Sequence, residues 1–236
     1  MSEVEKITMD EARELVSDPA LWPRVRDFLW DFAPQVHSSW LEGLETSDAR
    51  RDGKGFAPAV SRLMSSSRTR RFILSSLGVE PCFHTFPKDD WSRLLLLDGA
   101  TLESMVKWLG ALACADRLRG VTDGKAVRAL KAALPGVYPD VFGYTAYFGR
   151  SRIGNLEVKV EEGRIGEIGV FGCGILLSLL GTLPPALVSR LKLKLPKAYS
   201  GAPPLEAVSP SPVFSLQLLS RLLKLKFPEA YSICCS

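Results

Sequence analysis

Apolar residues recur every three or four positions along most of the chain, a spacing that is typical of amphipathic helices. The most regular stretch covers residues 101–120, with Thr101 as the expected cap and Gly120 as the expected stop. Its charged residues lie off the apolar face, so this helix is predicted to pack against a core. The face is formed by Leu102, Met105, Val106, Leu109, Leu112 and Ala113.

Two more core-facing helices follow from the same pattern. One is predicted to begin near residue 123 and to stop at Pro135, with Arg128 and Lys131 pointing away from its apolar side. The other is predicted to begin with Asp18 as its cap and Pro19 at its first helical position, and to end at Pro34. Its apolar face consists of Val25, Phe28, Leu29 and Phe32.

The remainder of the N-terminal half has weaker patterns. Short helices are predicted over residues 8–16, 57–64 and 69–78, and the last of these has Gly78 as its stop. Residues 46–55 have the composition of a loop. We therefore expect a single domain over residues 1–236, with a looser helical part (1–88) followed by a denser one (89–236).

A basic and apolar motif occurs twice near the C-terminus, as "SRLKLKLPKAYS" and "RLLKLKFPEAYS". The leucines of the second copy fit a helix and do not alternate as in a strand, so both copies are predicted to be helices that end at the proline. Lys194 and Lys226 would lie near the apolar face in the last turn and extend outward to water. Two copies are too few for a solenoid.

One segment has a β pattern. Between residues 155 and 170, apolar and charged residues alternate and a Glu-Glu-Gly turn follows, which indicates a short hairpin. The predicted fold class is thus all-α, a compact multi-helix domain with one small β-hairpin as an optional addition near 155–170.

Residues 168–189 contain no charged residue, and Arg190, Lys192 and Lys194 follow them. Three interpretations are open: a buried core helix, peripheral contact with a membrane, and a membrane-spanning helix. Pro184 and Pro185 interrupt the run, and the part before them is short for a bilayer, so the buried helix is favoured.

Composition excludes several classes of function. The chain has 30 Lys and Arg against 26 Asp and Glu, a net charge of +4, which is too small for a nucleic-acid-binding footprint. Its N-terminus is acidic and polar, unlike a secretory signal, so a cytoplasmic location is expected. Five cysteines without framework spacing indicate reduced thiols.

Candidate catalytic chemistry is sparse. Cys82 and His84 form the only neighbouring Cys/His pair, and this pair supports a thiol enzyme centred on Cys82 only weakly. Neither this pair nor Cys234 and Cys235 has the ligand spacing of a zinc site. The glycine-containing loops lack the lysine-hydroxyl pair of a phosphate-binding loop, so no cofactor and no metal are expected. The five tryptophans fit either core residues or interface anchors. They are Trp22, Trp30, Trp40, Trp91 and Trp108.

The order and spacing of several leucine-rich motifs resemble the SctK or YscK family, accessory proteins of the cytoplasmic sorting platform of bacterial type III secretion systems. The motifs are "LLLLDGATLESMVKWLGALACADRLRGVTDGKAVRALKAAL", "RLKLKLP" and "RLLKLKFPEAYS", with "DPALWPRVRDFLW" nearer the start. The resemblance covers the chain from about Trp91 to its end. The glycine-rich stretch 143–181 departs from the helical pattern expected there.

This resemblance implies a mostly helical adaptor without enzymatic activity. Such an adaptor bridges the cytoplasmic domain of the inner-membrane ring protein (SctD-like) and the pod protein (SctQ-like), and meets the membrane only through the ring. No catalytic or cofactor-binding residue is implied. The main rival interpretation is a peripheral membrane protein, and the third is the thiol enzyme centred on Cys82.

The candidate partner-binding residues are four lysines at or near the ends of the two C-terminal helices. Such lysines either complement the helix dipole or form a basic surface for an acidic partner, and we favour the partner role. They are Lys192, Lys194, Lys197 and Lys224.

Overall fold

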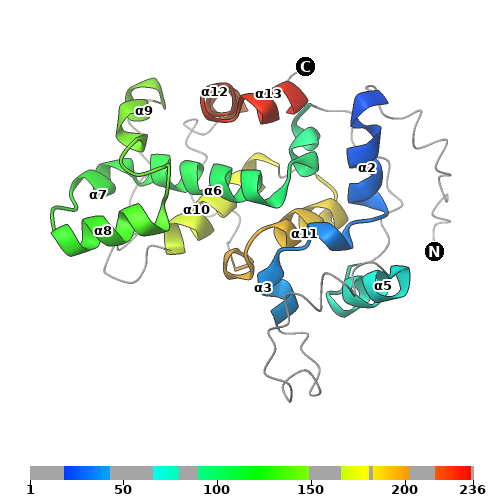
Figure 1. Ribbon diagram of the computed structural model, residues 1–236. Coiled ribbons are helices and arrows are strands. Elements are labelled where there is room, and N and C mark those ends of the chain that lie inside the picture. Colours follow the sequence, from blue (N-terminus) through cyan, green and yellow to red (C-terminus); the bar gives the residue numbers. More distant parts are fainter. Residues whose placement is uncertain are drawn as a thin grey trace, which may run out of the picture. The chain divides into compact units, whose positions relative to one another are not determined.

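The computed structural model describes residues 19–42, 66–79, 90–148, 166–180, 183–201 and 216–234. Every regular element in these ranges is helical, so the all-α prediction is confirmed (Figure 1). The helices form two compact units built from interleaved segments. The first unit takes Met1–Gly99, Thr182–Lys197 and Ser232–Ser236, and the second takes Ala100–Gly181 and Ala198–Tyr231.

The first unit is built around α11 and the helices of the N-terminal half. Its core includes the four apolar residues predicted for the α2 region, all of which are buried. They are joined there by Leu94 and Leu95 of η4 and by Leu187 and Leu191 of α11. Its elements are η1 (Pro19–Leu21), α2 (Trp22–Leu29), η2 (Ala33–Gln35), α3 (Ser38–Leu41), α5 (Ser67–Ser76), η4 (Asp90–Leu96) and α11 (Pro185–Lys194).

The second unit contains the long helices α6 and α10. Leu109 of α6 and Leu130 of α8 are buried, as the apolar pattern of each predicted. Its elements are α6 (Gly99–Ala113), α7 (Ala115–Arg119), α8 (Gly124–Ala133), α9 (Val141–Phe148), α10 (Gly166–Leu179), η5 (Lys197–Tyr199), α12 (Leu216–Lys226) and α13 (Pro228–Cys234). The boundary between the units leaves Gly99 of α6, Lys197 of η5 and the last residues of α13 in the first unit.

Helix boundaries follow local chemistry. Asp123 caps α8 by accepting a 2.7 Å hydrogen bond from the backbone N–H of Ala126, and Gly136 follows the helix with a φ of 70°. Gly78 has a φ of 67° beyond the end of α5, as its predicted role as a stop requires. The single helix predicted over residues 101–120 is instead two helices, because Cys114 leaves helical geometry between α6 and α7.

The two copies of the C-terminal motif are helices that end before the proline, as predicted. α11 ends at Lys194, and Leu195 takes an extended conformation (ψ 158°) ahead of Pro196. α12 ends at Lys226, two residues before Pro228.

Glycines allow α6 and α10 to approach closely. A Cβ atom on Gly110 would lie 2.0 Å from the carbonyl oxygen of Ile168, and one on Gly172 would lie 1.9 Å from that of Val106. Neither position has room for any side chain, so glycine at these two positions is a packing requirement.

The segment predicted as a hairpin is helical where the structure describes it. Residues 166–170 form the first turn of α10, and 155–165 lie outside the described residues. The prediction is therefore wrong for its C-terminal part. The reason is that Ile168 is buried and its backbone packs against Gly110, a contact between helices that local alternation does not reveal.

The uncharged run is divided between α10 and the start of α11, and its α10 part is a buried core helix as the sequence favoured. Ile168, Leu176 and Leu180 are buried inside the second unit. Within the described ranges, no helix has both the length and the apolarity that crossing a membrane requires.

Replacing Gly172 with Ala is expected to lower the free energy of unfolding by about 2 kcal/mol or more, because α10 must move away from α6 to admit the methyl group. Gly143→Ala is the matched control. This glycine lies in α9 with no atom within 4 Å of an added Cβ, so alanine there should be neutral or stabilising by up to about 1 kcal/mol. Denaturant unfolding of both variants tests the contact, and equal midpoints would contradict it.

Candidate functional site

The four candidate lysines lie in different environments. Lys194 is buried, Lys192 is partly buried, and Lys197 and Lys224 are exposed. Lys194 is therefore not part of an exposed basic surface, and each lysine is described within its own unit.

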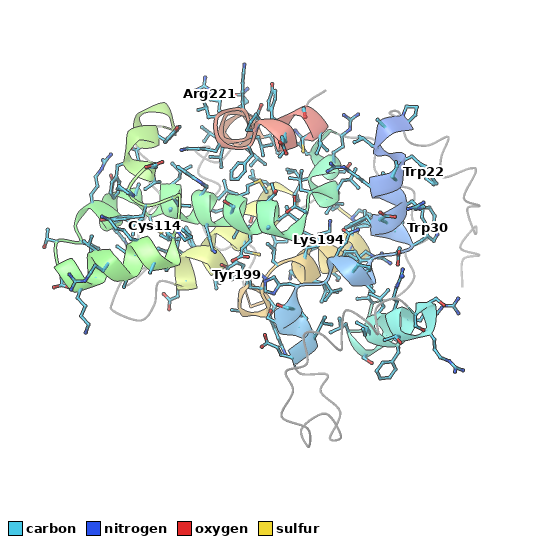
Figure 2. All side chains as sticks on the ribbon, viewed as in Figure 1. Trp22, Trp30, Cys114, Lys194, Tyr199 and Arg221 are labelled. Atoms are coloured by element: carbon cyan, nitrogen blue, oxygen red, sulfur yellow. The ribbon has the colours of Figure 1, made fainter. Side chains whose placement is uncertain are left out.

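Lys194 is an interior residue of the first unit (Figure 2). Its Nζ donates hydrogen bonds of 2.6 Å to the carbonyl oxygen of Leu95 and 2.8 Å to that of Leu97. The same atom lies 5.0 Å from the centre of the Phe28 ring. The interpretation of Lys194 as a surface residue for a partner is thus wrong, because its amine is directed into the core by backbone acceptors.

The environment of Lys194 changes its titration. Burial lowers its pKa from 10.5 to about 7, opposed by the nearby carboxylate of Asp98 and reinforced by the positive charge of Arg24. Either protonation state retains N–H groups for the two carbonyls, so loss of the proton does not leave those acceptors unpaired.

Arg190, one turn before Lys194 on α11, is buried in the same way. Its guanidinium donates hydrogen bonds to the carbonyl oxygens of Phe28 (2.5 Å) and Leu29 (3.0 Å), and its Cζ lies 5.2 Å from the centre of the Phe32 ring. These carbonyls belong to the last turn of α2, where a helix has no internal donors for them. We call Arg190 and Lys194 the α11 cation clamp.

The clamp was missed from the sequence although its spacing is visible there. Arg190 and Lys194 follow Leu187 at three and seven residues, so both lie on the buried side of α11. The sequence pattern placed Lys194 near the apolar face but predicted that its amine extends outward to water, and it gave Arg190 no role in the core.

Lys226 occupies the corresponding position in the second copy of the motif. Its Nζ lies 4.6 Å from the ring centre of Trp108 and 4.4 Å from that of Tyr144, with an oxygen of Asp140 at 3.5 Å. Its side chain is 20% exposed, so it packs between aromatic rings of the second unit instead of extending into water as expected.

The exposed lysines have different neighbours. Lys197 lies with its Nζ 5.9 Å from the ring centre of Trp40, and its backbone N–H donates to the hydroxyl of Ser39. Trp40 itself donates from Nε1 to the carbonyl oxygen of Leu195 at 2.9 Å. Lys197 therefore belongs to a local cluster around α3, whereas Lys224 projects from α12.

α12 has one face that no described residue covers. Gln217, Arg221, Lys224 and Leu225 are all exposed, and their spacing places them on one side of the helix, opposite the buried Leu219, Leu222 and Leu223. Leu225 is 50% exposed, and Arg221 extends from the outer side of α12 (Figure 2). We call Gln217, Arg221, Lys224 and Leu225 the α12 outer face.

The described cysteines are packing residues. Cys114, Cys173 and Cys234 are buried and take part in no disulfide bond, and burial raises the pKa of Cys114 to about 11 against the opposing effect of Arg117. A thiol with this pKa is protonated and a poor nucleophile near neutral pH. Cys82, His84 and Cys235 lie outside the described residues. Nowhere in the described ranges do His, Cys, Asp and Glu residues gather as a metal site requires.

The tryptophans divide in a similar way. Trp108 is buried in the second unit, and the other four are partly buried. Trp22 and Trp30 contact each other along α2, with 5.9 Å between ring centres (Figure 2). None is the freely exposed anchor that an interface hypothesis needs.

Comparison of the chain with protein-family models, with curated proteins and with solved structures finds no match. Its function is therefore inferred from the residues and surfaces described above and from the resemblance found in its sequence.

The lowered pKa of Lys194 predicts a specific pH dependence of stability. Between about pH 7 and 10.5 the unfolded chain keeps a proton on this lysine that the folded chain has lost, so stability rises with pH across this window. Lys194→Met lacks this titration. The free energy of unfolding of the wild type relative to the variant should therefore increase by roughly 1–2 kcal/mol between pH 7 and pH 9. Chemical denaturation of both proteins at both pH values measures this increase. If the difference in free energy of unfolding between them is the same at pH 7 and pH 9, the pKa of Lys194 is that of an ordinary lysine.

Proposed function

We propose that this protein is a non-enzymatic adaptor of a type III secretion sorting platform, acting at the cytoplasmic face of the inner membrane. In this role it bridges the cytoplasmic domain of an SctD-like ring protein and an SctQ-like pod protein. Support comes from the ordered motifs that resemble the SctK/YscK family and from an all-helical fold, which is the fold class that the resemblance implies.

The observation that carries the proposal is the α12 outer face. Arg221 lies in the middle of this helix. The effect of the helix dipole is confined to the first and last turns, so the dipole does not account for a positive charge at this position. Neither Arg221 nor Lys224 has an ion pair with a described residue. Arginine is enriched at protein interfaces, and Leu225 adds exposed apolar surface beside Arg221.

The chemistry of this face defines the partner surface that fits it. Arg221 and Lys224 favour carboxylates, and Leu225 favours a shallow apolar depression between them. Association through such a contact depends on ionic strength, because exposed charges are screened by salt.

The peripheral-membrane alternative has less support than the adaptor. It depends on the uncharged run of residues 168–189, and the α10 part of this run uses its apolar residues inside the second unit. The α12 outer face has a single exposed leucine, too little apolar surface for insertion into a bilayer.

Reversing both charges of the α12 outer face, with Arg221→Glu and Lys224→Glu, is expected to reduce capture of the tagged pod or ring protein at least about tenfold. The reason is that attraction to a carboxylate-rich partner becomes repulsion. Pull-down of each tagged component with the full-length variant measures this effect. Leu225→Ser should weaken capture while lowering the melting temperature only slightly, because half of the leucine is already exposed.

The control is Arg128→Glu with Lys131→Glu on α8. This pair has the same three-residue spacing, the same exposure and the same change in net charge. Capture should be retained in the control. Equal capture by the two charge-reversed proteins, both folded by their melting curves, would refute the α12 outer face as the docking surface.

A further inference from the structure

α5 presents a second surface with unusual exposure, in the first unit. Among the described residues, the exposed large apolar side chains are Phe72, at 61%, and Leu225, at 50%. Arg68 and Arg71 are exposed on the same side of the helix. The rest of this side consists of Ser67, Ser75 and Ser76, and it contains no carboxylate. We call these six residues the α5 outer face.

The opposite side of α5 fixes the helix to its own unit. Ile73 is buried there, and Arg70 forms an ion pair with Asp31, which follows α2. One arginine of the helix is thus used inside the unit. By contrast, neither Arg68 nor Arg71 is paired with a described carboxylate.

We propose that the α5 outer face docks an acidic helical segment of a partner protein. The planar guanidinium groups of Arg68 and Arg71 suit bidentate contact with carboxylates from consecutive turns of such a segment. Phe72 supplies an aromatic anchor beside them, and arginine and aromatic residues dominate binding energy at protein interfaces. The small serines allow the backbone of the partner to approach the helix.

Other occupants fit this face less well. A membrane-bound helix needs a broad apolar face, but the apolar residues of α5 other than Phe72 face its own unit. Two arginines are too few for a nucleic-acid footprint. A second copy of the chain, related by twofold symmetry, would bring Arg68 and Arg71 against the same cations.

This surface is independent of the α12 outer face, since the two lie on different units. A protein that bridges two partners needs two docking surfaces, so the α5 outer face extends the proposed function. It does not depend on that function, because its recognition chemistry holds for any acidic partner.

The test uses a fluorescent amphipathic peptide composed of glutamate and leucine at helical spacing, and measures its binding by anisotropy. Every protein in the series is full length and has Arg221→Glu and Lys224→Glu, which removes the α12 outer face as a second acceptor. In this background the peptide should bind, and binding should weaken as salt increases. Arg68→Glu with Arg71→Glu should weaken it at least about tenfold, and Phe72→Ser at least about threefold.

The matched control is again Arg128→Glu with Lys131→Glu, which should leave peptide binding unchanged. Equal binding by the α5 charge-reversed protein and this control would overturn the proposal. So would flotation of the background protein with phosphatidylglycerol vesicles in the absence of peptide binding, which would identify a membrane as the occupant. Because the peptide is not a secretion component, peptide binding together with failed capture of the pod and ring proteins would reject only the proposed function.

Discussion

Two buried basic side chains on one face of α11, Arg190 and Lys194, connect this helix to α2 and η4 within the first unit. Charged groups are expensive to remove from water unless hydrogen bonds replace the lost hydration. Arg190 provides donors to the carbonyls that end α2, and Lys194 provides them to the carbonyls that end η4. Without Arg190 and Lys194, those carbonyls would lose these hydrogen bonds at positions where the turn itself supplies few donors. Cation and carbonyl therefore depend on each other, and α11 fixes the ends of two elements far from it in sequence.

The repeated C-terminal motif uses the same design twice with different acceptors. In each copy, the lysine two residues before the proline points inward. Lys194 contacts backbone carbonyls and the ring of Phe28, and Lys226 contacts two aromatic rings. The inward lysines are thus part of the packing of their units, and only the outward basic residues are available to partners. Arg221 and Lys224 remain outside on α12, as Arg68 and Arg71 do on α5, and the proposed docking surfaces consist of these outward cations beside one exposed apolar residue each.

The all-α class and most described helices could be predicted, because an amphipathic face and a stop residue are local properties of the sequence. Asp123, Gly78 and Pro196 mark helix boundaries by local chemistry: a side-chain cap, a left-handed glycine and a proline ring, respectively. Contacts between distant segments could not be predicted. The burial of Lys194 depends on carbonyls almost one hundred positions away, and the helical start of α10 depends on Gly110. The partner roles of Lys192, Lys197 and Lys224 stay predictions, since burial alone does not decide them.

Amide hydrogen exchange after Arg190→Met tests most directly whether the α11 cation clamp fixes the end of α2. Methionine fills much of the volume but donates no hydrogen bond, so the carbonyls of Phe28 and Leu29 lose their donors. Mass spectrometry under native conditions should show exchange in α2 accelerated at least about tenfold, with α8 in the second unit unchanged. Unchanged exchange in α2, or equal acceleration in α2 and α8, would contradict the account.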